Sequence, residues 1–133
     1  MTDTVTFVQS LYAAFGRGDL KSILDVSDPA IEWVSNGSPT TIPWAGTHTG
    51  HAGATEFFVA LGGHLDFEAF EPRQFLPSGE TVAVLGRTRA RHKNAGQGVF
   101  DCEWAHFFTI RNGKLVRFQE FYDTAAIEHA LAA

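Results

Sequence analysis

The 133-residue chain has one cysteine, one methionine and no long uninterrupted apolar run. A single cysteine, Cys102, cannot form an intramolecular disulfide and offers no second thiol for a metal site, so we interpret it as a small buried apolar residue. The apolar runs are too short to cross a membrane, and the first residues lack the basic start and apolar stretch of a signal peptide. We therefore expect a cytoplasmic protein with no membrane partner.

Positive charge is also scarce. The chain has 10 Lys and Arg against 15 Asp and Glu, which gives a formal net charge of -5 and offers nucleic-acid phosphates no obvious attraction. We therefore expect no nucleic-acid partner. Hydrophobic residues make up 44% and charged residues 19%, a balance typical of a globular protein rather than a disordered chain. The length fits one hydrophobic core, and we predict a single domain over residues 1–133.

The first part of the chain has the residue spacing of helices. Apolar residues recur at helical intervals over residues 5–15, which predicts an amphipathic helix. Asp19 is expected to cap a second helix that ends near Pro29, because proline disfavours helical geometry in the residue before it. A short strand is predicted over residues 31–35. Residues 36–50 are rich in Gly, Pro, Ser and Thr and are expected to form a loop.

The second part of the chain has the spacing of strands. A third helix that buries Phe57 should end at Gly62–Gly63, and Asp123 should cap a short final helix. The Asn112–Gly113 pair predicts a tight hairpin because both residues tolerate positive φ. Helices followed by a run of strands indicate an α+β fold with an antiparallel sheet. The predicted strands cover residues 67–76, 81–91, 99–110 and 115–122.

Alternation along the last two predicted strands places two polar residues on apolar faces. Successive strand residues face opposite sides of a sheet, so His106 shares its face with Trp104, and Glu120 shares its face with Phe118. An unpartnered carboxylate on an apolar face is costly. Glu120 therefore implies a hydrogen-bond partner, a carboxyl group that keeps its proton, or an opening to solvent.

These residues are candidates for acid–base chemistry. We assign Glu120 as the base, His106 as its orienting partner or as the acid, and Tyr122 as a donor to a developing oxyanion. The alternative is that Glu120 pairs with His106 or an arginine merely to hold the sheet together. The aromatic residues that would line a ligand cavity, or would instead be plain core, are Trp33, Trp44, Phe57, Phe75, Trp104 and Phe118.

A metal site has little support in the sequence. His48 and His51 are three residues apart and could share a metal on a helix, but Gly50 makes a helix across the pair doubtful, and no acidic third ligand is close in sequence. The chain has no phosphate loop, dinucleotide fingerprint or nucleophile elbow. We therefore expect no metal and no cofactor.

Four segments together resemble a known family: residues 11–19 (LYAAFGRGD), 43–47 (PWAGT), 103–108 (EWAHFF) and 117–123 (RFQEFYD). They resemble a SnoaL-like, ketosteroid-isomerase-related protein of the nuclear transport factor two-like superfamily, over nearly the whole chain. The resemblance implies a cone-shaped α+β barrel in which helices wrap a curved sheet around a pocket, with frequent dimerisation through the outer sheet face. It also implies cofactor-free isomerase, cyclase, dehydratase or epoxide hydrolase chemistry, although the superfamily includes members with no catalytic role. The first strand offers Glu32 and Trp33 in place of an inward aspartate base, so steroid isomerisation itself is not expected.

Two functions follow from these observations. The first is a small-molecule enzyme that uses cofactor-free acid–base chemistry on an apolar ring compound in an aromatic-lined pocket. The second is a non-catalytic small-molecule-binding or protein-association module of the same fold. They differ in whether Glu120 and His106 reach an open cavity. A homodimer is also predicted, because apolar residues would otherwise be exposed on the outer sheet face: Ala105, Phe107, Leu115 and Phe121.

Overall fold

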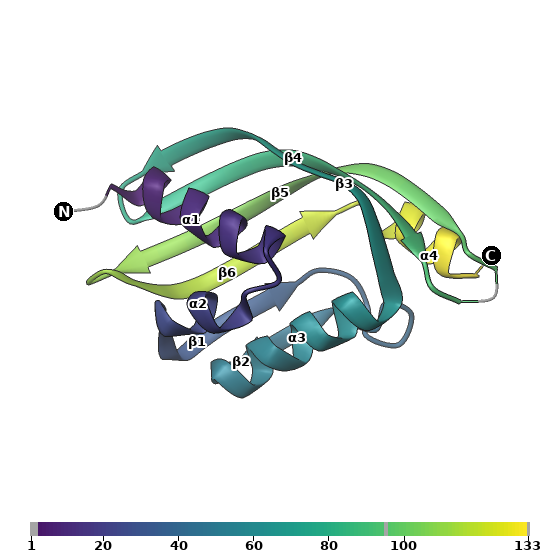
Figure 1. Ribbon diagram of the computed structural model, residues 1–133, viewed down its shortest axis with the longest axis horizontal. Coiled ribbons are helices and arrows are strands. Elements are labelled where there is room, and N and C mark those ends of the chain that lie inside the picture. The colour runs from purple at the N-terminus through teal and green to yellow at the C-terminus, as the bar shows by residue number, and fades with distance from the viewer. Residues whose placement is uncertain (1–2, 95, 133) are drawn as a thin grey trace.

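Helices and strands follow one another in the α+β order predicted from the sequence. The computed structural model describes residues 3–94 and 96–132 (Figure 1). The elements are α1 (Thr4–Gly16), α2 (Leu20–Asp25), β1 (Ser27–Ser35), β2 (Gly46–Thr49), α3 (Gly50–His64), β3 (Leu65–Ser78), β4 (Thr81–His92), β5 (Val99–Arg111), β6 (Lys114–Tyr122) and α4 (Thr124–Ala132).

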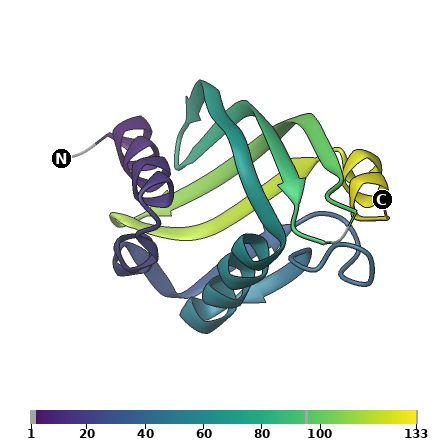
Figure 2. The same cartoon turned by 45° about the vertical axis from the view of Figure 1, so that its right-hand side comes forward.

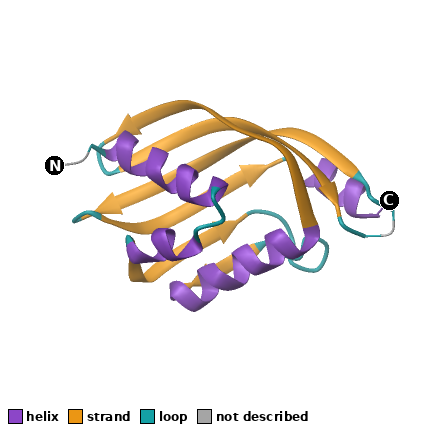
Figure 3. Cartoon of the chain, viewed as in Figure 1, coloured by secondary structure: helices purple, strands orange, loops and turns teal. Residues whose placement is uncertain are grey.

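The strands form one curved sheet in the order β2-β1-β6-β5-β4-β3. Strands β3 to β6 form the predicted antiparallel meander, whereas β1 pairs with β6 in parallel. Helices α1, α2 and α3 lie across one side of the sheet, and α4 lies beyond the end of β6 (Figures 1 and 3). The turned view shows the sheet curving around these helices without closing into a barrel (Figure 2). The cone-shaped α+β fold is therefore confirmed.

Aspartate caps begin the helices as expected. The Asp19 side chain accepts a hydrogen bond from the Ser22 N–H at 3.1 Å, and Asp123 accepts one from the Ala126 N–H at 3.0 Å. Each cap satisfies a backbone donor that the first helical turn cannot pair internally. None of the described helices is long and apolar enough to span a membrane.

Three local predictions were wrong. Helix α3 continues through Gly62–Gly63 to His64, because neither glycine adopts a positive φ and the buried Leu65 then begins β3. The expected loop over residues 36–50 contains β2, which pairs with β1 through Trp33 and His48. Strand β1 also begins earlier than predicted, since an irregular stretch of its pairing with β6 accommodates Pro29.

A bulge in β6 changes which residues face outward. The register shifts between the pair Thr109 and Arg117 and the pair Ile110 and Leu115, which leaves Val116 as the extra residue. Leu115 is therefore fully buried, and its predicted place on the outer sheet face was wrong.

The inner face of β5 follows the predicted alternation. The Asn112–Gly113 turn that joins β5 to β6 has φ values of 53° and 74°, as a tight hairpin requires. All six residues that share a face with His106 and Trp104 by this alternation are buried: Phe100, Cys102, Trp104, His106, Phe108 and Ile110. These side chains form the floor on which the helices pack.

Candidate active site

Two small cavities, of about 50 and 60 Å³, lie between the sheet and the helices. Both have predominantly apolar walls and share four lining residues: Leu61, Phe70, His106 and Glu120. The two polar residues of the predicted site therefore reach a cavity, as an acid–base enzyme requires. Each cavity has room for a few water molecules or part of a small ligand.

Five of the six aromatic residues predicted as ligand contacts line these cavities. Trp44 and Trp104 line the first, which we call the α4-side cavity because Ile127 of α4 closes it. Phe75 lines neither cavity, and its ring instead lies edge-on to Tyr12, with the ring centroids 6.0 Å apart. The second, which we call the α1-side cavity because Leu11, Tyr12 and Phe15 of α1 line it, is also lined by Trp33, Phe57 and Phe118.

Sheet register brings the polar groups together. In the antiparallel pairing of β5 with β6, His106 lies opposite Glu120, and in the parallel pairing of β1 with β6, Ser35 lies opposite Glu120. The carboxyl group is therefore flanked on both sides by polar residues of neighbouring strands. Glu120 Oε2 lies 3.5 Å from His106 Nε2, and Glu120 Oε1 lies 2.6 Å from Ser35 Oγ.

His106 is a buried imidazole with a polar partner at each ring nitrogen. Burial lowers its pKa, which favours the neutral ring. The Tyr12 oxygen lies 2.7 Å from His106 Nδ1, and burial raises the pKa of Tyr12, so that hydroxyl keeps its proton. The other ring nitrogen, Nε2, faces Glu120. The Trp104 indole stacks on the imidazole with ring centroids 3.7 Å apart.

Tyr122 completes a polar chain across the site. Its hydroxyl oxygen lies 2.8 Å from Ser35 Oγ and donates to the main-chain carbonyl of Asn36 at 2.6 Å. Burial raises the pKa of Tyr122, so this hydroxyl also keeps its proton. We use the name polar chain for the connected groups of Tyr12, His106, Glu120, Ser35, Tyr122 and Asn36.

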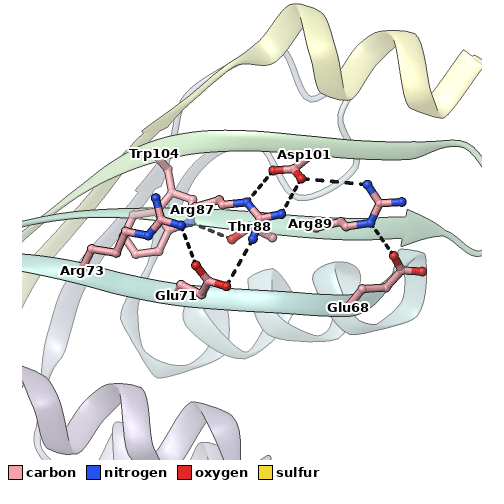
Figure 4. Close-up of polar contacts among 8 residues, drawn as sticks. All are labelled: Glu68, Glu71, Arg73, Arg87, Thr88, Arg89, Asp101 and Trp104. Atoms are coloured by element: carbon pink, nitrogen blue, oxygen red, sulfur yellow. Dashed lines mark hydrogen bonds and ion pairs between the residues drawn. The ribbon is translucent and has the colours of Figure 1, made fainter.

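The wall beside His106 is itself held in place. The Trp104 indole N–H donates to Thr88 Oγ1 at 2.6 Å, and both residues are buried. Figure 4 shows this pair beside an ion-pair network that crosses β3, β4 and β5. In that network Arg87 binds both Asp101 and Glu71, so much of the basic charge on these strands is neutralised by neighbouring carboxylates.

Sequence reasoning did not identify three members of the polar chain: Tyr12, Ser35 and Asn36. Tyr12 lies on the apolar face of α1, and it is the residue of that face with a hydroxyl group. That hydroxyl group is the feature of the sequence that could have indicated a polar partner inside the protein. Ser35 has a role only because β1 lies parallel to β6, and no short-range pattern in the sequence predicts that pairing.

The structure places His48 in β2 and His51 in α3, and each contacts a different main-chain carbonyl group. Gly50 is the first residue of α3, so His51 is helical and His48 is not. His48 Nε2 lies 3.0 Å from the Trp44 carbonyl, and His51 Nε2 lies 3.0 Å from the Ser27 carbonyl. Over residues 3–94 and 96–132, no group of three or more His, Cys, Asp or Glu side chains is placed to hold a metal ion.

Known structures share this architecture. An NTF2-like protein from Burkholderia xenovorans LB400 is 36% identical, with a TM-score of 0.83, over 96% of this chain and 94% of that one. An NTF2-like protein of unknown function from Burkholderia pseudomallei K96243 is 26% identical, with a TM-score of 0.89, over the full length of both chains. TerC, co-crystallised with polyporic acid, is 26% identical, with a TM-score of 0.81, over 97% of this chain and 98% of its own.

The family assignment agrees with these structures. No curated protein matches the chain. The family model of the SnoaL-like domain matches residues 8–118, which run from within α1 to the middle of β6. The protein therefore belongs to the SnoaL-like family, within the NTF2-like superfamily.

Proposed function

We propose that the protein is an enzyme that moves protons on a small apolar ring compound without a cofactor, by isomerisation, cyclisation, dehydration or epoxide opening. The observation that carries this proposal is the polar chain, because it sets a carboxyl group, an imidazole and two phenols between two apolar cavities. Acid–base catalysis commonly uses titratable groups in a cavity whose pKa values are shifted by burial and whose positions are fixed by hydrogen-bond partners.

Each group has a distinct task in this proposal. Glu120 exchanges a proton with the ligand, since its carboxyl group lines both cavities. His106 orients that carboxyl group through Nε2, and Tyr122 would turn its hydroxyl group from the Asn36 carbonyl to a developing oxyanion in the α4-side cavity. Trp33 and Trp104 are the apolar walls that position a flat ring. The co-crystallisation of TerC with polyporic acid supports a small organic ligand for this chain.

We also propose a homodimer, formed in the cytoplasm through the outer sheet face. Leu85, Phe107 and Phe121 are 40%, 37% and 43% exposed, and the rings of Phe107 and Phe121 lie edge-on with centroids 5.8 Å apart. A second copy would cover this apolar surface.

The test of the enzyme proposal is turnover by Glu120→Gln. Ligands are first found by quenching of tryptophan fluorescence with a library of flat, oxygen-bearing aromatic compounds, and those that bind are assayed for conversion. Glu120→Gln should still fold and bind yet lose about two or more orders of magnitude in rate, because Gln cannot exchange a carboxyl proton. Glu103→Gln, at an exposed position of β5, is the matched control and should turn over normally.

A non-catalytic module would convert none of the compounds that it binds, whereas a purely structural Glu120 predicts a third result. If Glu120 only holds the sheet together, Glu120→Gln should melt at a lower temperature while its folded fraction binds and turns over like the wild type. That outcome would refute the enzyme proposal for this site.

A further inference from the structure

The Thr88 hydroxyl group can both accept and donate a hydrogen bond, and the structure fills only the first of these roles. The Trp104 indole N–H, which can only donate, donates to Thr88 Oγ1 at 2.6 Å. This contact uses a lone pair of the oxygen and leaves the hydroxyl proton of Thr88 for another partner. None of the described residues accepts that proton. Because Thr88 is buried, the proton needs an acceptor that bulk solvent does not supply.

The hydroxyl group lies beside the candidate active site. Thr88 lines the α4-side cavity together with Glu120 and Tyr122. Its partners in the sheet, Phe70 on β3 and Cys102 on β5, line the same cavity. A phenyl ring and a thiol are weak hydrogen-bond acceptors, so neither replaces an oxygen. We propose that the Thr88 hydroxyl group is a specificity-determining donor to an acceptor oxygen of the ligand.

Thr88 and the acid–base groups contact different parts of that ligand. Thr88 is on β4, whereas Glu120 and Tyr122 are on β6, and β5 lies between these strands. Two strand spacings are about 10 Å. The side chains of Glu120 and Tyr122 also reach Ser35 on β1, which lies on the side of β6 away from β4. One ligand oxygen therefore cannot bind both ends of the cavity, and the oxygen held by Thr88 is not the reacting group.

The cavity lining also limits the kind of oxygen. The described residues around the α4-side cavity include no Lys or Arg, and burial lowers the pKa of His106, which favours its neutral form. A carboxylate bound to Thr88 would therefore be a buried charge without a counter-charge, which is costly. A neutral carbonyl or ether oxygen accepts the Thr88 proton without this cost.

These steps name a substrate class. The ligand is a ring compound with a neutral acceptor oxygen at one end, bound to Thr88, and the atom that exchanges a proton with Glu120 at the other. The position of the reacting atom rests on the proposed function of Glu120. The donor role of Thr88 does not, because it follows from the contact with Trp104 and from the cavity.

Calorimetry with 1-indanone and its carbon isostere 1-methyleneindane, in which C=CH₂ replaces C=O, tests the donor. The quantity compared is the affinity for the ketone divided by the affinity for the alkene. Thr88→Val should lower this ratio about three- to tenfold, the effect of one neutral hydrogen bond, and Thr88→Ser should preserve it because serine keeps the hydroxyl group. An unchanged ratio in Thr88→Val, or a wild type that does not bind the ketone, overturns the proposal.

Trp104→Phe separates the donor role from the support that Thr88 gives to the Trp104 wall. A displaced wall would change the affinities for both compounds together and leave their ratio as it was. In the Trp104→Phe background Thr88 no longer binds an indole, so adding Thr88→Val should still lower the ratio by about the same factor. If the ratio falls only when Trp104 is present, Thr88 acts by positioning the wall, and the proposal is wrong.

Wild-type protein alone gives a second measurement, in case a variant does not fold. In NMR spectra of the complex with 1-indanone, the Thr88 methyl group should show a nuclear Overhauser effect to the aromatic proton next to the carbonyl group, and its absence would overturn the proposal. Turnover distinguishes the two proposals. A ratio that depends on Thr88 without conversion of any compound would refute only the enzyme proposal, and conversion with a ratio independent of Thr88 would refute only this inference.

Discussion

Thr88→Val should destabilise the protein through the Trp104 wall. The substitution keeps the shape of the side chain and removes the acceptor that lies 2.6 Å from the Trp104 indole nitrogen. Thr88 and Trp104 are 5% and 7% exposed, so bulk solvent does not reach the pair, and only a water molecule in the α4-side cavity could replace the lost partner. A buried donor left without an acceptor costs about 1–3 kcal/mol.

That cost converts to a measurable fall in melting temperature. Unfolding entropy is roughly 2.1 cal/mol/K per residue, or about 0.28 kcal/mol/K for a chain of this length. Thr88→Val should therefore melt roughly 4–11 °C below the wild type in a calorimetric or circular-dichroism scan. Thr88→Ser keeps the hydroxyl acceptor and should recover most of the loss.

A double-mutant cycle separates the hydrogen bond from simple packing. Trp104→Phe removes the indole N–H, so adding Thr88→Val to it no longer leaves a buried donor without an acceptor. The double variant should be more stable than the sum of the single changes predicts, by roughly 0.5–3 kcal/mol. Additive effects, or a Thr88→Val melting temperature within about 1 °C of the wild type, would show that Thr88 does not hold Trp104.

Three further predictions concern other parts of the site and the outer surface. The buried Trp33 indole N–H has no hydrogen-bond partner among the described residues, and the Trp33 side chain lines the α1-side cavity. If a ligand supplies the missing acceptor, Trp33→Phe should weaken binding of acetophenone, which has an acceptor oxygen, but not of its isostere α-methylstyrene, as measured by calorimetry. Burial holds the pKa of His106 below its ordinary value of 6.5, so the imidazole of the unfolded chain is protonated first as pH falls. Stability should therefore drop below about pH 6.5, and it should drop less in His106→Gln. Equal slopes of melting temperature against pH in the two proteins would contradict this. Light scattering should give a dimer mass at micromolar concentration and a monomer mass for Phe121→Lys, whereas a wild-type monomer would remove the argument from the outer face.

Short-range chemistry explains what could be predicted about the fold. The caps at Asp19 and Asp123 and the turn at Asn112–Gly113 depend on residues within three positions of each other, and the structure has all three. The alternation along β5 is equally local, since burial on one face repeats every second residue. These features need no knowledge of the partner strand.

The missed features all depend on distant partners. Strand β2 exists because β1 offers it an edge, and Gly62–Gly63 remains helical because α3 runs directly into β3, whose first residue, Leu65, is buried. The bulge at Val116 depends on how β6 fits β5, and it turned Leu115 inward against the parity of the rest of the strand. Parity fails at a bulge because the extra residue resets the alternation.

The same distinction decides what the sequence could say about the site. Side-chain alternation predicted that His106 and Glu120 lie on the inner face, because each belongs to a regular stretch of strand. The two residues are also close together because β5 and β6 are paired strands of one hairpin. The residue that donates a hydrogen bond to the Glu120 carboxyl group, however, is Ser35 of β1, which reaches it only through a parallel pairing between the first and last strands of the chain. With His106 alone beside it, the carboxyl group would be held from one side only. Ser35 holds it from the other side and connects it to the Tyr122 hydroxyl and, through Tyr122, to the Asn36 carbonyl. The chemistry of Glu120 therefore depends less on its own strand than on which oxygen the neighbouring strand presents to it.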